Sequence, residues 1–195
     1  MRSRYMIQVR QAAIPMLALA GLLAWNTPVR AQGFGLGVRM AWVNPDVDAD
    51  VDSVRFYGGQ VRLVSQRLGL EVALDHHSES FELLNQKVSE TPIQMSVLMR
   101  LAGGSVSPFL LGGPGWYRRK VEALDGPGDL NASTTEFGWH AGIGVEALAS
   151  KHFGFHGDYR YTFLDFHKDN APGVIGKLLP GHRGSQWTLG FTFYF

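Results

Sequence analysis

Alternation of apolar and polar side chains with a period of two is the feature of this sequence that most limits its fold. Successive side chains of a β-strand point to opposite faces, so an alternating segment predicts a strand with one apolar and one polar face. Turn residues bound eight such segments, which predicts an all-β chain. The predicted strands are 34–43, 54–65, 68–75, 92–100, 108–118, 137–146, 153–163 and 186–195.

The fifth predicted strand, 108–118, departs from this pattern. It is rich in glycine, so its inward and outward faces are ambiguous from the sequence. It also contains Pro114, which has no N–H to donate to a neighbouring strand. We therefore expect a bulge or a kink at Pro114.

The connections between the predicted strands alternate in length. Short breaks fall at 66–67, 102–107 and 148–152, and long polar connections at 44–53, 76–91, 120–136 and 165–184. This alternation is typical of an up-and-down barrel, in which tight turns occupy the periplasmic end and longer loops the outer end. Both termini of the barrel are then expected on the periplasmic side.

The size of the side chains on the two faces distinguishes a membrane barrel from a soluble one. The polar faces carry small residues such as Gly35, Gly37 and Gly142, which suits a narrow interior filled by side chains. The apolar faces carry large side chains suited to lipid, and aromatics near strand ends suit the membrane interfaces. These predicted interface aromatics are Trp42, Trp116, Tyr117, Trp139, Trp187 and Phe195. The mean hydropathy of −0.05 is too low for a helical membrane protein.

Charged residues on the predicted inner faces have complementary signs. If Gln66 and Arg67 form a turn, antiparallel pairing places Arg62 opposite Glu71, within reach of an ion pair. The charges either fill and cross-link the barrel or line a narrow conduit for ions or small solutes, and we favour filling. The predicted lumen charge network consists of Arg39, Arg62, Glu71, Arg100, Glu146, His156, Asp158 and Arg160. The predicted fold is an eight-stranded antiparallel up-and-down transmembrane β-barrel.

The first 31 residues have the organisation of a secretory signal peptide. Three arginines, at 2, 4 and 10, precede the apolar run 12–25, and small side chains stand at Val29 and Ala31. The run is shorter than the roughly 20 residues of a membrane anchor helix. We predict cleavage after Ala31, which leaves a barrel domain of 32–195.

Net charge and cysteine content exclude several classes of function. The chain has no cysteine, which excludes disulfides, thiolate metal sites and a cysteine nucleophile. Four of the 18 basic residues lie within 1–31, which leaves 14 basic and 17 acidic residues in the remainder. Basicity therefore gives no support to a nucleic-acid partner.

Three segments contain strand motifs built on glycines and alternating aromatics: SVSPFLLGGPGW, FGWHAGIGVEALASKHFGFHGDYRYTFLDF and the terminal WTLGFTFYF. These segments resemble the outer-membrane β-barrel superfamily of OmpA-type, opacity and porin-like proteins. The last segment resembles the carboxy-terminal signal read by the barrel-assembly machinery, which implies this role for Trp187, Leu189, Phe191, Phe193 and Phe195. The resemblance implies an outer-membrane location, contact with membrane lipid and lipopolysaccharide, and surface ligands bound through outer loops. Known members include adhesins, structural proteins and small-solute channels.

Aspartates alternate at positions 46, 48, 50 and 52. Such spacing suits calcium, but a calcium-binding EF-hand loop also needs Gly at its sixth position and Glu at its twelfth. Val51 and Tyr57 stand there instead. The preferred interpretation is a solvated acidic loop, and the alternative is weak binding of divalent cations near lipopolysaccharide.

Two groups of residues that contain histidine are candidate sites of chemistry. The run 76–79 contains His, Ser and Glu, as a hydrolase of lipid A would need, but neighbours in one loop do not generally converge on a substrate. His140 and His156 both fall on predicted inner faces, where two imidazoles begin a metal site with no identifiable third ligand. Packed, hydrogen-bonded histidines are the preferred interpretation.

We therefore predict a non-enzymatic barrel with a side-chain-filled lumen, no cofactor and a structural or interaction role for its surface loops. A narrow porin-like channel is the alternative, and a lipid A-modifying enzyme ranks third.

Overall fold

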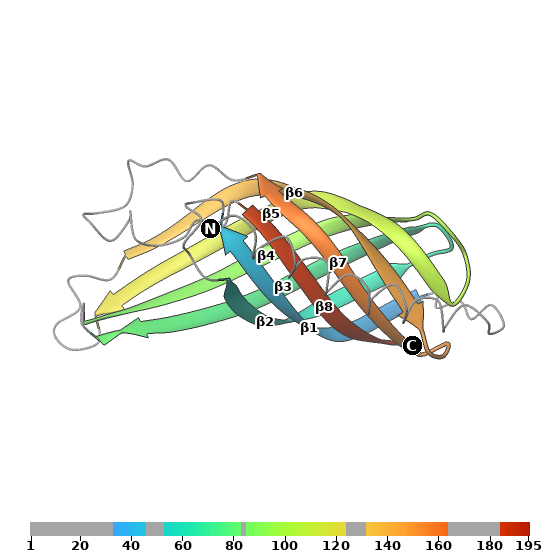
Figure 1. Ribbon diagram of the computed structural model, residues 1–195, viewed down its shortest axis with the longest axis horizontal. Coiled ribbons are helices and arrows are strands. Elements are labelled where there is room, and N and C mark those ends of the chain that lie inside the picture. The colour runs from blue at the N-terminus through green and yellow to red at the C-terminus, as the bar shows by residue number, and fades with distance from the viewer. Residues whose placement is uncertain (1–32, 46–52, 83–84, 124–131, 164–183) are drawn as a thin grey trace, which may run out of the picture.

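The computed structural model describes residues 33–45, 53–82, 85–123, 132–163 and 184–195. Eight strands form one closed barrel in which each strand pairs antiparallel with its neighbours in sequence and β1 pairs with β8 (Figure 1). This confirms the predicted architecture. No helix among these residues has the length and apolarity needed to cross a membrane. The strands are β1 (Gly33–Pro45), β2 (Val54–Val64), β3 (Leu68–Phe81), β4 (Gln86–Arg100), β5 (Val106–Ala123), β6 (Ala132–Leu148), β7 (Phe153–Phe163) and β8 (Gly184–Tyr194).

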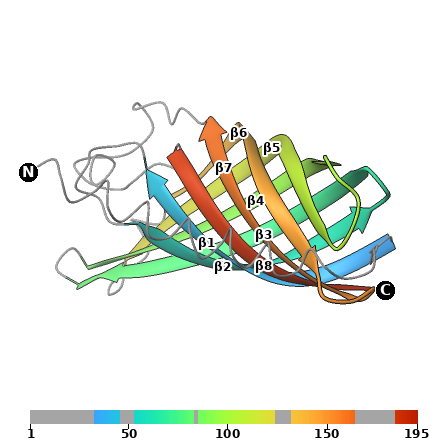
Figure 2. The ribbon, with the colours of Figure 1, turned by 45° about the vertical axis from the view of Figure 1, so that its right-hand side comes forward.

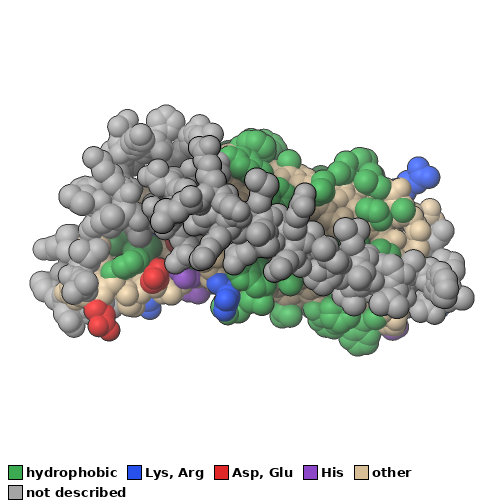
Figure 3. Space-filling model, viewed as in Figure 1, with side chains coloured by type: hydrophobic (Ala, Val, Ile, Leu, Met, Phe, Trp, Pro, Cys, Tyr) green, Lys and Arg blue, Asp and Glu red, His purple; other side chains and the backbone are tan. Residues whose placement is uncertain are grey.

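The two faces of the barrel wall are divided as the alternation predicts. Val38 is 66% exposed on the outside, whereas its neighbour Arg39 is 4% exposed on the inside. The same alternation of inward and outward side chains runs along all eight strands, although some inward side chains are apolar, such as Phe56, Leu98 and Phe109. Figure 3 shows hydrophobic side chains on the visible part of the outer wall. An apolar exterior around a polar interior is the arrangement of a membrane-spanning barrel.

The hairpin between β2 and β3 has the predicted register. Arg62 lies opposite Glu71, and Nε of Arg62 donates a hydrogen bond of 2.8 Å to Oε2 of Glu71. The short turn fixes this pairing because the length of a tight turn sets the register of its hairpin, and a one-residue slip would turn a polar face outward. The prediction from the turn position is therefore confirmed.

Of the bulge or kink expected at Pro114, the bulge is absent from the described β5. The register between β4 and β5 is the same on both sides of Pro114, from Gln94 opposite Gly115 to Val97 opposite Gly112. The ladder is interrupted only between these two pairs. Gly113 explains how the strands stay in register, because a Cβ built there would lie 2.0 Å from the backbone oxygen of Met95. The glycine lets the two backbones approach closely beside the proline.

Two of the predicted long loops are largely strand. β3 continues to Phe81 and β4 begins at Gln86, so most of the predicted loop 76–91 forms a hairpin. Likewise β5 continues to Ala123 and β6 begins at Ala132, within the predicted loop 120–136. These four strands extend beyond β1, β2, β7 and β8 at one end of the barrel (Figures 1 and 2), which we call the loop end. The opposite end, with the turns 65–67, 101–105 and 149–152, is the turn end.

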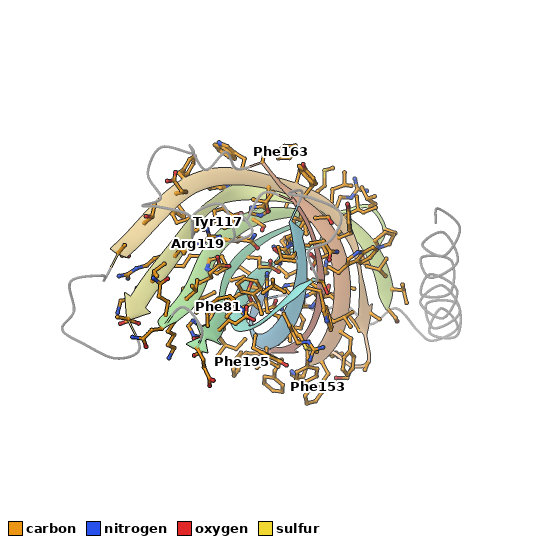
Figure 4. All side chains as sticks on the ribbon, turned by 60° about the vertical axis from the view of Figure 1, so that its left-hand side comes forward. Phe81, Tyr117, Arg119, Phe153, Phe163 and Phe195 are labelled. Carbon is orange, nitrogen blue, oxygen red and sulfur yellow. The ribbon has the colours of Figure 1, made fainter. Side chains whose placement is uncertain are left out.

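Aromatic side chains gather on the outside toward both ends. Trp116, Phe137 and Trp139 form edge contacts with ring centroids 5.7 Å apart toward the loop end. Phe153, Phe193 and Phe195 pack together at the turn end (Figure 4). Tyr117 does not belong to these groups: its side chain is 2% exposed and points into the barrel, so its predicted place at the membrane interface is wrong.

Candidate functional site

The barrel interior contains a network of four arginines and four carboxylates, whose formal charges cancel. Six strands supply these residues, because each of the six has a charged side chain that points into the barrel. The side chains of these eight residues are at most 10% exposed. The residues are Arg39 on β1, Arg62 on β2, Glu71 and Asp75 on β3, Arg100 on β4, Glu146 on β6, and Asp158 and Arg160 on β7.

Glu71 is the centre of this network. Its Oε2 accepts hydrogen bonds from Nε and Nη2 of Arg62, at 2.8 and 2.5 Å. Its Oε1 lies 3.4 Å from Nη1 of Arg39 and 3.3 Å from Nη2 of Arg160. β3 and β7 are four strands apart in the closed barrel, so the Glu71–Arg160 pair links opposite walls across the lumen.

Glu146 forms a second centre closer to the turn end. Its carboxylate pairs with Arg62 at 3.3 Å and with Arg100, and it accepts a hydrogen bond of 2.5 Å from the hydroxyl of Tyr194. Arg62 therefore bridges Glu71 and Glu146, and the two centres form one continuous network. Removing any single member leaves a buried charge with fewer partners.

The predicted set lacks one residue of the network, Asp75, and two neutral residues bonded to it, Gln94 and Tyr194. Asp75 accepts a hydrogen bond of 2.8 Å from Arg39, and Oε1 of Gln94 accepts one from Arg39 at 3.2 Å and one from Arg160 at 2.9 Å. Tyr194 is the third. All three lie on the inner faces that the alternation identifies, so their position in the alternation predicts that their side chains point into the lumen. The sequence could not show which inward polar groups from distant strands meet.

The structure places both inward histidines in the lumen but not together. His140 of β6 lies opposite Thr162, and His156 of β7 lies opposite Glu146. The two histidines are therefore separated by six residues along the direction of β6. Nε2 of His140 is 2.9 Å from the hydroxyl of Ser96. Neither ring nitrogen of His156 has a hydrogen-bond partner among the described residues, so the expectation of a hydrogen bond is wrong there. The described residues contain no group of three potential ligands placed to hold a metal.

The packing of His156 shows how tightly the lumen is filled. A Cβ built on Gly190 would lie 2.1 Å from Cε1 of the imidazole, so the ring occupies the space above that glycine. Gly144 is likewise covered by the ring of Phe109, at 2.4 Å from the built Cβ. Inward glycines thus make room for large neighbouring side chains, which keeps the narrow interior packed.

The remaining chemical candidates do not form a site in the described structure. Ser78 faces outward and its hydroxyl lies 3.2 Å from that of Ser89, whereas His77 contacts the carbonyl oxygen of Arg55 at 2.9 Å. His76 pairs with Thr91 at 3.1 Å. The strand thus places His77 on the face opposite Ser78, while His76 and Ser78 share the outward face and each contacts a residue of β4. The aspartates at 46–52 and the predicted signal peptide lie outside the described residues.

Three solved structures share this fold. Neisserial surface protein A superposes with a TM-score of 0.59 at 14% identity, with 85% of this chain and 99% of that chain covered. OprG from Pseudomonas aeruginosa gives 0.57 at 15% identity, with 87% and 99% covered. The N-terminal β-barrel domain of Pseudomonas aeruginosa OprF gives 0.56 at 9% identity, with 85% and 100% covered. Identities this low establish the fold alone.

No curated protein is detectably similar to this chain in sequence. The model of the outer membrane protein β-barrel domain family, however, matches residues 14–195, nearly the whole chain. The family locates its members in the outer membrane, in agreement with the apolar exterior and the closed barrel. The chain belongs to the outer membrane protein β-barrel domain family.

Proposed function

We propose that this protein is a non-enzymatic outer-membrane barrel with a closed lumen, which serves a structural or interaction role through the hairpins at its loop end. The observation that carries the proposal is the buried, charge-balanced network that joins opposite walls through Glu71 and Arg160. An eight-stranded barrel leaves an interior only wide enough for side chains. A network bonded from wall to wall is therefore a plug as well as a cross-link.

The closed lumen predicts that the protein does not conduct. Reconstituted into planar bilayers, the full chain should show no steady single-channel current above the lipid background, because ions would have to displace buried ion pairs. A steady ohmic current that disappears in Arg160→Gln would contradict the proposal and favour a narrow channel. Glu122→Gln is the matched control, because Glu122 is an exposed carboxylate outside the lumen.

The hairpins support the interaction role. β3 to β6 have 14 to 18 residues each, whereas β2, β7 and β8 have 11, so one side of the barrel extends beyond the other. A membrane of about 30 Å thickness needs strands of only about 9–11 residues. The additional residues of β3–β6 therefore lie outside the membrane, where they can meet a ligand or another surface protein.

The proposed orientation predicts which connections are accessible in intact cells. An epitope inserted between β5 and β6 should bind antibody on intact cells, since that hairpin projects from the loop end. An epitope inserted into the turn 101–105 should bind only after the outer membrane is permeabilised. The reverse pattern would place the hairpins in the periplasm and contradict a surface role.

A further inference from the structure

The outward face of β3–β6 changes character abruptly where the hairpins leave the apolar band. Strand pairing aligns Leu74, Ile93, Trp116 and Phe137 in one transverse row, all apolar and outward. The next outward positions are all polar. They form what we call the hydroxyl–basic face: His76, Ser78 and Ser80 of β3, Lys87, Ser89 and Thr91 of β4, Arg118 and Lys120 of β5, and Ser133 and Thr135 of β6.

The change from the apolar row to the hydroxyl–basic face occurs between two successive outward residues of one strand. Trp116 is 39% exposed in the apolar row, and Arg118 is the next outward residue of the same strand. Outward neighbours along a strand are about 7 Å apart. The Arg118 guanidinium is therefore at the level where lipid head groups begin, immediately beside a tryptophan of the type that marks this interface.

The hydroxyl–basic face combines positive charge with hydroxyl donors. Lys87, Arg118 and Lys120 contribute three cations, and Nε of Arg118 lies 3.2 Å from the hydroxyl of Ser133. Glu122 is the one carboxylate among the described outward residues of these strands beyond the apolar row, and it pairs with Lys120 at 2.6 Å. The acidic residues Glu79, Glu90 and Glu136 alternate onto the opposite face. The outward face is thus net positive.

The opposite wall of the barrel lacks this arrangement. There Trp42 pairs with Trp187 on the outside, and the next outward residues are Asn44 and Ser185, which pair with each other and carry no charge. Among the described residues, β1 and β8 therefore carry no outward charge at this level, whereas Arg55 of β2 is exposed opposite Trp42 and adds one cation beside the hydroxyl–basic face. A ligand attracted to that face must be anionic and reachable from the membrane surface.

We propose that the hydroxyl–basic face binds the phosphate groups of anionic lipids that surround the barrel. Guanidinium and ammonium groups form charge-assisted hydrogen bonds with phosphate oxygens, and serine and threonine hydroxyls add neutral donors. The face continues directly from the lipid-facing surface, so acyl chains of the same lipid can pack on Trp116 and Phe137 below it. The inference depends on the outer-membrane location and not on the closed lumen, so a conducting barrel would leave it intact.

Quenching of single tryptophans by brominated lipids tests the proposal. One reporter keeps only Trp116, with the other tryptophans replaced by phenylalanine, and the second keeps only Trp187 on the opposite wall. Each full chain is refolded into phosphatidylcholine vesicles that contain a minor fraction of either brominated phosphatidic acid or brominated phosphatidylcholine. Comparison of the two quenchers gives the relative binding constant of the anionic lipid beside each reporter.

Trp116 should report a preference for phosphatidic acid of about fivefold or more, since one basic residue near an anionic surface contributes about that factor. Trp187 should report none. The preference at Trp116 should disappear in K87Q/R118Q/K120Q and persist in K87R/R118K/K120R, which keeps the charges. Equal quenching of Trp116 by both lipids, or a preference that survives neutralisation, would overturn the proposal.

A second measurement avoids the tryptophan replacements. Spin-labelled phosphatidic acid and spin-labelled phosphatidylcholine report the fraction of lipid immobilised by the barrel. The chain with its native tryptophans should immobilise more phosphatidic acid, and K87Q/R118Q/K120Q should lower that excess while leaving phosphatidylcholine unchanged. These three side chains are outward-facing, so their replacement leaves the lumen contacts intact. An unchanged excess would overturn the proposal.

Discussion

Glu71→Leu is expected to lower the free energy of unfolding by about 3–5 kcal/mol, because it removes one partner of a fully buried ion-pair network. Three arginines point at this carboxylate. Arg62 loses its closest partner and keeps Glu146 at 3.3 Å, whereas Arg39 and Arg160 each lose one of their carboxylate partners. Lipid surrounds the barrel, so water cannot readily reach the uncompensated charge. Urea unfolding in lipid vesicles, followed by tryptophan fluorescence, measures the effect.

Two controls identify the buried charge as the cause. Glu122→Gln removes an exposed carboxylate and should leave the unfolding midpoint unchanged. The double change Arg62→Leu with Glu71→Leu removes one charge of each sign and should cost less than the sum of the two single changes, because the remaining charges balance. Additive losses would show that the two residues act independently, against the 2.8 Å contact between them.

Gly113→Ala is expected to destabilise the barrel by about 3 kcal/mol or more, because overpacking against immobile atoms cannot be relieved by a rotamer change. The added Cβ would lie 2.0 Å from the backbone oxygen of Met95 and 3.0 Å from its carbonyl carbon. To accept it, β4 and β5 must separate at the point where Pro114 already interrupts their ladder. The loss should appear as a lower urea midpoint and a lower yield of refolded barrel.

Gly59→Ala is the matched control for this prediction. Gly59 also lies within a strand, but the nearest atom to a Cβ built there is 3.6 Å away, which is an ordinary contact. Its replacement should leave the urea midpoint close to that of the unchanged chain. Equal losses at both positions would mean that glycine content in general, and not the close approach at Met95, limits stability.

The sequence predicted the parts of the fold that depend on local pattern. Alternation assigns inward and outward faces because the side-chain period of a strand is two, and a tight turn fixes the register of its hairpin. The Arg62–Glu71 pair follows from these two facts. The Glu71–Arg160 contact does not, because it depends on how the barrel closes and on the stagger between strands far apart in the chain.

The errors occurred where a local signal was missing. Above the membrane both faces of β3–β6 meet water or polar neighbours, so apolar alternation disappears and strand resembles loop in the sequence. Glycines in β5 conceal its phase, so the sequence does not show that the Tyr117 ring fills the lumen beside Gln94. His156 shows a different limit of sequence analysis. The alternation predicts that its side chain is buried, but it does not show that both ring nitrogens lack a hydrogen-bond partner among the described residues.

Because the strands differ in length, some of them have unpaired edges at the loop end, although closure of the barrel pairs both edges of every strand elsewhere. Toward the turn end every strand pairs with two neighbours, but the pairing of β2 with β3 ends at His76 and that of β6 with β7 begins at Trp139. Within the described residues, 77–81 and 132–138 are therefore exposed sheet edges, each able to recruit a strand from another molecule. Serine, threonine and glutamate predominate at both edges, and Glu79 and Glu136 place a negative charge on each. Like-charged edges repel each other, so the polar composition of these hairpins also prevents edge-to-edge strand pairing between neighbouring barrels.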